Sequence, residues 1–141
     1  MYVKIAHAVI AAMLASCACA HAQADISGKY IRSKPSHGEL TVTNQGNHWK
    51  ISVVGAGLPR GPATAADCEA IAEGAMTHGT LIAHTVPFEG NDISVSAEDL
   101  SNGEHEFVVK FDSMGAKVTK DDVSFCGDGS DLTGRYIKSK K

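Results

Sequence analysis

Apolar residues occupy every second position in several short stretches of the chain. This period of two is that of a β-strand with one face on a core and the other in water. The alternating apolar residues are Leu40 and Val42; Trp49, Ile51 and Val53; Ile93, Val95 and Ala97; and Phe107, Val109 and Phe111. Clusters rich in Gly, Asn and Ser predict turns at 44–47, 89–92, 101–103 and 113–115. Short strands joined by such turns favour an all-β sandwich or up-and-down barrel.

The segment 63–76 (ATAADCEAIAEGAM) is compatible with two structures. It is rich in helix formers, and Asp67 would cap a short helix. However, small residues occupy the even positions from 68 to 74, and Gly74 weakens a helix by about 1 kcal/mol relative to alanine. We therefore expect a strand here, then a turn at 77–79 and a further strand over 80–86. A short helix around 63–76 is the alternative.

Two ten-residue segments far apart in the chain resemble each other. Residues 25–34 are DISGKYIRSK and residues 131–140 are DLTGRYIKSK, with six of ten positions identical. A closed barrel needs its first and last strands to pair, which also removes two exposed edges. We therefore expect a small antiparallel up-and-down barrel of about eight strands, with these two segments side by side. The alternative is chance similarity between two amphipathic strands.

The first 24 residues have the features of an export signal. Lys4 supplies a positive charge, residues 5–14 (IAHAVIAAML) are a short apolar run, and Ala22-Gln23-Ala24 matches the small-x-small cleavage pattern. Ten residues are too few to span a bilayer, which takes about 20 as a helix. We therefore expect a signal peptide over 1–24, a single β-barrel domain over 25–141, no transmembrane segment, and a periplasmic or secreted protein.

The same region holds a second processing motif. Residues 14–17 (LASC) resemble the lipobox of bacterial lipoproteins and directly follow the apolar run. Cleavage there would leave Cys17 lipidated and the protein anchored to the outer membrane. Processing therefore has two alternatives, and the folded domain is the same in both.

Removal of the signal leaves two cysteines, Cys68 and Cys126. An even number of cysteines in an oxidising compartment predicts a disulfide bond between them. The chain-entropy model gives a loop of this length about 4 kcal/mol of stabilisation.

Charge and motif content exclude several classes of function. The formal net charge is −3, which argues against a general nucleic-acid binder. The cysteines form no Cys-x-x-Cys pair, the histidines have no ligand spacing, and no nucleophile motif occurs. We therefore expect no enzymatic activity, no metal site and no cofactor.

A few short motifs resemble a known group of proteins. They are Gly28-Lys29-Tyr30, the mid-chain Cys68, Phe125-Cys126-Gly127, and Gly134-Arg135-Tyr136. Together they are similar to small exported β-barrels of Gram-negative bacteria with a calycin-like character, the group that includes lipocalins and avidins. The chain departs from lipocalins at the first strand, where the expected Gly-x-Trp is Gly-x-Tyr. The resemblance implies a barrel, and no functional residue is transferred from it.

Without catalytic chemistry, binding is the expected function, and two kinds of partner compete. The segment 55–62 (GAGLPRGP) would display Leu58, Pro59 and Arg60 as a candidate partner-binding loop, whose prolines limit its freedom. This favours an inhibitor or immunity protein against a cell-wall hydrolase or toxin. The alternative is a calycin-like carrier of a small apolar ligand inside the barrel. Alternatively, the same segment is a loop that joins two strands and binds no partner.

Overall fold

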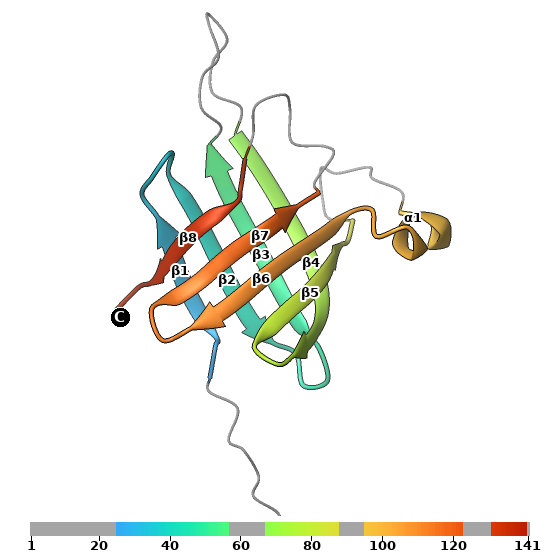
Figure 1. Cartoon of the computed structure of the whole chain (residues 1–141), viewed down its shortest axis with the longest axis horizontal. Helices are drawn as coiled ribbons and strands as arrows, with labels where there is room; N and C mark the ends of the chain where they lie inside the picture. Colours follow the sequence, from blue (N-terminus) through green and yellow to red (C-terminus); the bar gives the residue numbers. More distant parts are fainter. Residues whose placement is uncertain (1–24, 57–66, 88–94, 123–130, 141) are drawn as a thin grey trace, which may run out of the picture.

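The computed structural model describes residues 25–56, 67–87, 95–122 and 131–140. They form one closed barrel of eight antiparallel strands in which neighbours in sequence are neighbours in space (Figure 1). The strands are β1 (Gly28–Arg32), β2 (Gly38–Asn44), β3 (Trp49–Ala56), β4 (Asp67–Thr77), β5 (Thr80–Thr85), β6 (Glu106–Asp112), β7 (Gly115–Asp121) and β8 (Gly134–Lys138). A short helix, α1 (Ala97–Ser101), lies between β5 and β6 outside the barrel wall. The predicted all-β, up-and-down barrel is confirmed.

The first and last strands close the barrel, as the repeated segments predict. β1 and β8 are antiparallel, with Tyr30 opposite Lys138 and Ile31 opposite Ile137. The Ser139 N–H also donates to the Lys29 carbonyl at 2.7 Å. Closure gives each of the eight described strands two hydrogen-bonded neighbours, so none of these strands has an edge open to other chains.

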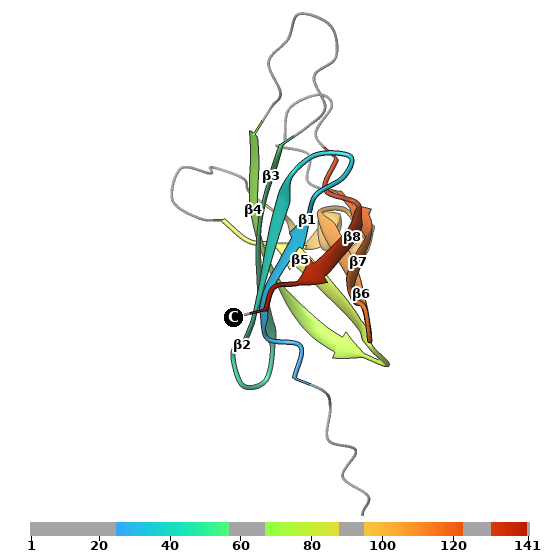
Figure 2. The same ribbon diagram turned by 90° about the vertical axis from the view of Figure 1, so that its left-hand side faces the viewer.

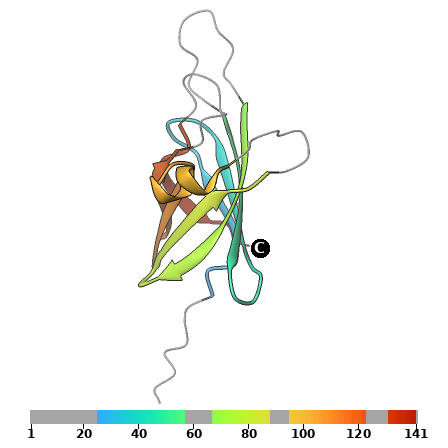
Figure 3. The same cartoon turned by 90° about the vertical axis from the view of Figure 1, so that its right-hand side faces the viewer.

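The two ends of the barrel differ in their connections. Tight turns join β2 to β3, β4 to β5 and β6 to β7 at one end, which we call the hairpin end. The longer connections begin at the opposite end, which we call the connection end. Seen edge-on in Figures 2 and 3, β1–β4 form one wall and β6–β8 cross it on the other side.

The core follows from the alternation along the strands. In β2, for example, Leu40 and Val42 are buried while Thr41 between them is only partly so. The side chains that line the interior and are at most 3% exposed are Tyr30, Leu40, Val42, Ile51, Val53, Cys68, Ala70, Ala72, Leu81, Ala83, Phe107, Val109, Ala116, Val118, Leu132 and Tyr136. One continuous apolar cluster therefore fills the barrel.

The ambiguous segment is a strand over its described part, 67–77, as expected. A Cβ on Gly74 would collide with the backbone of Ile82 and Ala83 on β5, so only glycine fits where the two strands approach. The predicted turn at 77–79 is confirmed, and both His78 and Gly79 have positive φ, at 49° and 76°. The helical alternative is wrong for these residues, and 63–66 lie outside the described part of the chain.

The strand predicted around Ile93, Val95 and Ala97 is wrong over its described part, 95–97. Ala97 begins α1, and Ile93 lies outside the described residues. Ser96 caps the helix: its Oγ accepts the Asp99 N–H at 3.1 Å, and the Asp99 carboxylate accepts the Ser96 N–H at 2.7 Å. Hydrogen bonding of the Asp99 carboxyl to the Ser96 backbone, and then to the Ser96 side chain, holds the pKa of Asp99 below its ordinary value. A capping box therefore outweighed a brief apolar alternation.

Candidate functional site

Some of the predicted site residues belong to the described part of the chain and others lie outside it. Cys68 is buried as the second residue of β4, paired in register with Gly55 at the connection end of the barrel. Cys126, Cys17 and the loop residues Leu58, Pro59 and Arg60 lie outside the described residues. The disulfide bond, the lipidation site and the partner-binding loop therefore stay predictions.

The two copies of the repeated segment have the same local structure. The phenol of Tyr30 donates to the Ile26 carbonyl at 2.6 Å, and the phenol of Tyr136 donates to the Leu132 carbonyl at 2.8 Å. In each copy the tyrosine thus bonds the residue four positions earlier. This bond folds the start of the copy back over the end of the barrel, with Leu132 at the connection end and Ile26 at the hairpin end.

The cation near the end of each copy lies over the tyrosine ring of the other copy. The guanidinium carbon of Arg32 lies 5.4 Å from the centroid of the Tyr136 ring, and the Lys138 Nζ lies 5.6 Å from that of Tyr30. Arg32 donates to the Asp131 carbonyl at 2.7 Å, while Lys138 donates to the equivalent carbonyl of Asp25 at 2.9 Å. Each copy therefore contacts the tyrosine and the first residue of the other copy, and we call these reciprocal contacts the clasp. The two copies are related by an approximate two-fold axis that passes through the antiparallel pairing of β1 with β8.

The two cations, Arg32 and Lys138, differ in how deeply they are buried. Arg32 is fully buried, and it also donates to the Thr133 carbonyl at 2.6 Å and to the carbonyl and hydroxyl of Ser36 at 3.2 and 3.0 Å. Room for this side chain comes from Gly38, where a Cβ would lie 3.2 Å from the Arg32 Nε. Lys138 is exposed. The connection end is thus closed by a buried, hydrogen-bonded arginine.

The barrel interior is packed rather than hollow. Leu132 is 1% exposed at one end of it, and Ile26 packs against the cluster at the other. A ligand-sized cavity would expose the side chains that line it, yet the members of the apolar cluster are at most 3% exposed. Trp49, Met76 and Phe111 are partly buried and pack against this cluster. Burial also raises the pKa of Tyr136 to about 12. Among the described residues, the interior therefore has the character of a core and not of a binding pocket.

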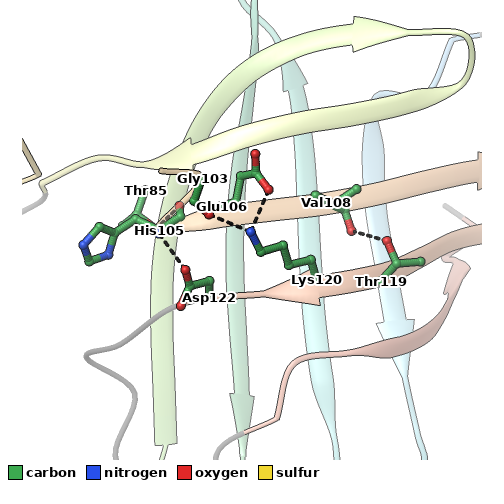
Figure 4. A network of polar contacts seen from close by, with 8 residues as sticks. All are labelled: Thr85, Gly103, His105, Glu106, Val108, Thr119, Lys120 and Asp122. Atoms are coloured by element: carbon green, nitrogen blue, oxygen red, sulfur yellow. Dashed lines mark hydrogen bonds and ion pairs between the residues drawn. The ribbon is translucent and has the colours of Figure 1, made fainter. Parts of the chain in front are cut away.

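A polar network fixes the turn after α1 to the barrel wall (Figure 4). His105, with a φ of 57°, donates its N–H to the Asp122 carboxylate at 2.9 Å and accepts the Thr85 N–H at 3.0 Å. Lys120 donates to the Gly103 carbonyl at 2.6 Å and to Glu106 at 2.8 Å. These bonds satisfy backbone and charged groups of the turn, so we assign the network a structural role.

Charges on the outer wall pair across strands in most places. Lys29 on β1 contacts Glu39 on β2. Lys50 on β3 lies opposite Glu73 on β4. On β6–β8, however, three cations lie in one cross-strand row: Lys110 opposite Lys117, and Lys117 opposite Arg135. No strand was predicted at β7 from the sequence, although Ala116 and Val118 alternate there with polar residues, and this row was therefore not predicted either.

Other kinds of site have no support in the described residues. No group of three or more His, Cys, Asp and Glu side chains in the described ranges is placed to hold a metal ion. Within those ranges, no helix combines the length and apolar character needed to cross a membrane. Comparisons with protein-family models, with curated proteins and with solved structures found no match for this chain.

Proposed function

We propose that this chain is an exported protein that binds another protein with its outer surface, as an inhibitor or immunity protein of a cell-wall hydrolase or toxin. Binding of a partner from outside requires a rigid scaffold and does not require an internal pocket. The closed barrel and the mutual clasp of the two repeated segments provide such a scaffold.

The observation that supports this proposal best is the packed interior. An eight-stranded barrel is just wide enough either to be filled by side chains or to hold one small ligand. Here large side chains such as Phe107, Leu81 and Ile51, all 0% exposed, occupy the inside. This packing favours an external partner over the alternative, a carrier of a small apolar ligand.

Export and an oxidising compartment are parts of the same proposal. They rest on the signal features of residues 1–24 and on the even number of cysteines that follow. A periplasmic location would place the chain beside cell-wall hydrolases and incoming toxins. Lipidation at Cys17 would instead hold it at the outer membrane, within reach of the same partners.

Photo-crosslinking in intact cells tests the proposal. A photoreactive residue is introduced at exposed positions around the barrel, the captured protein is identified, and its purified form is assayed with and without this chain. We expect a hydrolase or toxin whose activity falls at equimolar concentrations of the chain. Native mass spectrometry of the protein taken from its source provides the opposing outcome: a stoichiometric small molecule bound to the barrel would refute the proposal in favour of the carrier.

A further inference from the structure

Within the row of Lys110, Lys117 and Arg135, the facing lysines are an unfavourable arrangement for the fold alone, whereas Arg135 forms an ion pair with Asp112. Side chains directly opposite each other on antiparallel strands are about 4.5–5.5 Å apart at Cβ, and like charges at such positions are destabilising. Lys110 and Lys117 are exposed, and within the described part of the chain neither makes an ion pair. An acidic residue at either position would remove this repulsion, so the fold gives no reason for two lysines.

The two most exposed large apolar side chains of the described residues lie beside the row. Met114, in the turn between β6 and β7, is 67% exposed, and Ile137 on β8 is 52% exposed. A Cβ on Gly115, next to Met114, would be 3.3 Å from the Cα of Ile137, so the turn lies close to β8. Exposed apolar groups next to cations, with methionine and arginine among them, are typical of protein–protein interfaces.

Asp112 holds this surface in place before any partner binds. One carboxylate oxygen accepts the Met114 N–H at 2.9 Å, and both oxygens accept from the Arg135 Nη1 at 2.8 and 2.7 Å. The Arg135 hydrogen bond, followed by that of Met114, holds the pKa of Asp112 below its ordinary value, so the carboxylate stays ionised at neutral pH. A turn and an arginine that are already fixed lose less conformational entropy on binding.

We infer that the outer face of β6–β8, defined by Lys110, Lys117, Arg135, Met114 and Ile137, is the docking surface for an acidic patch on the partner protein. This inference rests on the proposed function and adds to it the surface and the chemistry of the partner. Carboxylates of the partner neutralise the lysine row and remove its internal repulsion. Met114 and Ile137 bury apolar area beside them.

The charge of the whole chain favours a protein over other polyanions. At a net charge of −3 the chain is repelled at long range by a nucleic acid or an anionic membrane, which present uniform negative charge. A protein surface with a local acidic patch avoids this repulsion. The exposed Met114 and Ile137 also match apolar groups that a nucleic-acid backbone lacks.

The test compares charge reversals in and outside the row. Lys117→Glu changes its centre, and Lys34→Glu is the matched control at an exposed cation in the loop between β1 and β2. Binding of a short poly-L-glutamate peptide is measured by calorimetry and by NMR amide shifts at low and moderate salt. We expect binding to weaken about tenfold in Lys117→Glu, little change in Lys34→Glu, and shifts that map to β6–β8. Lys117→Glu should also melt above the wild type, because it replaces the repulsion between Lys110 and Lys117 by an attraction.

Several outcomes overturn the inference. Equal affinity of the two variants, or amide shifts that map to another face, would reject the surface. Tighter, Lys117-dependent binding to a DNA duplex or to phosphatidylglycerol vesicles would reject a protein as the occupant. The proposed function is judged separately by crosslinking: a hydrolase or toxin captured and inhibited through another face would uphold that function while rejecting this surface.

Discussion

Replacement of Arg32 by methionine is expected to destabilise the barrel strongly. Methionine keeps much of the aliphatic stem but removes the guanidinium, which donates four hydrogen bonds to Ser36, Asp131 and Thr133 from a fully buried position. The contact with the Tyr136 ring is lost as well.

The magnitude follows from opposing terms. Hydrogen bonds from a charged donor contribute about 1.5–3 kcal/mol each, so four of them give roughly 6 kcal/mol or more. Removal of a buried charge also relieves a desolvation penalty of several kcal/mol. The net loss is then about 3 kcal/mol, which for a domain of this size lowers the melting temperature by roughly 10 °C.

The second copy of the repeated segment supplies a control variant for Arg32→Met. Lys138→Met removes the equivalent cation from the other copy, which is exposed and donates one bond, to the Asp25 carbonyl. An exposed cation over a ring with one such bond contributes about 1 kcal/mol or less. Thermal and urea unfolding, followed by circular dichroism, compare the two variants with the wild type. Arg32→Lys keeps the charge with fewer fixed donors, and its stability should lie between those of the wild type and Arg32→Met. Equal losses for Arg32→Met and Lys138→Met would refute the reasoning.

Two further predictions concern Tyr136 and its strand. Burial raises the pKa of Tyr136 to about 12 in the folded state, against about 10 when unfolded, so stability present below pH 10 should decline as the pH rises toward 12; tyrosinate absorbance that titrates near pH 10 while the protein stays folded would contradict this. Deletion of residues 131–141 should prevent cooperative folding, because it removes β8 and leaves β1 and β7 with open edges; a truncated protein that melts at the wild-type temperature would reject the role of β8 in closure.

The architecture could be predicted from the sequence because its two signals, the alternation within single strands and the repeated segment, are visible in the residues themselves. Alternation at Leu40 and Val42, or at Phe107 and Val109, reflects burial of one strand face, and this pattern survives in the fold. The likeness of 25–34 to 131–140 predicted the β1–β8 pairing, since an up-and-down order of strands makes its first and last members neighbours when the barrel closes. Failure came at 95–97, where the Ser96 cap, a local hydrogen-bonding feature, outweighed the apolar pattern.

The surface of the candidate site could not be predicted in the same way. Lys110, Lys117 and Arg135 are unremarkable as single residues, and their like charges become informative only through strand register. Register between β6 and β7 also shifts at Val108 and Val109, which a pattern of alternation does not reveal. The unequal burial of Arg32 and Lys138 likewise depends on the absence of side chains at Gly38 on β2 and Gly55 on β3, which only the pairing of the strands brings to Arg32.

The clasp between the two repeated segments can form only after both ends of the domain have been synthesised. A ribosome makes β1 first, yet the ring that Arg32 covers and two of the carbonyls that it bonds belong to residues 131–136. The strands in between can pair in hairpins as they emerge, because each neighbour follows closely in the chain. The guanidinium of Arg32 stays solvated by water until the last strand has been made. A completed clasp is therefore found only in a chain that has been translated through β8.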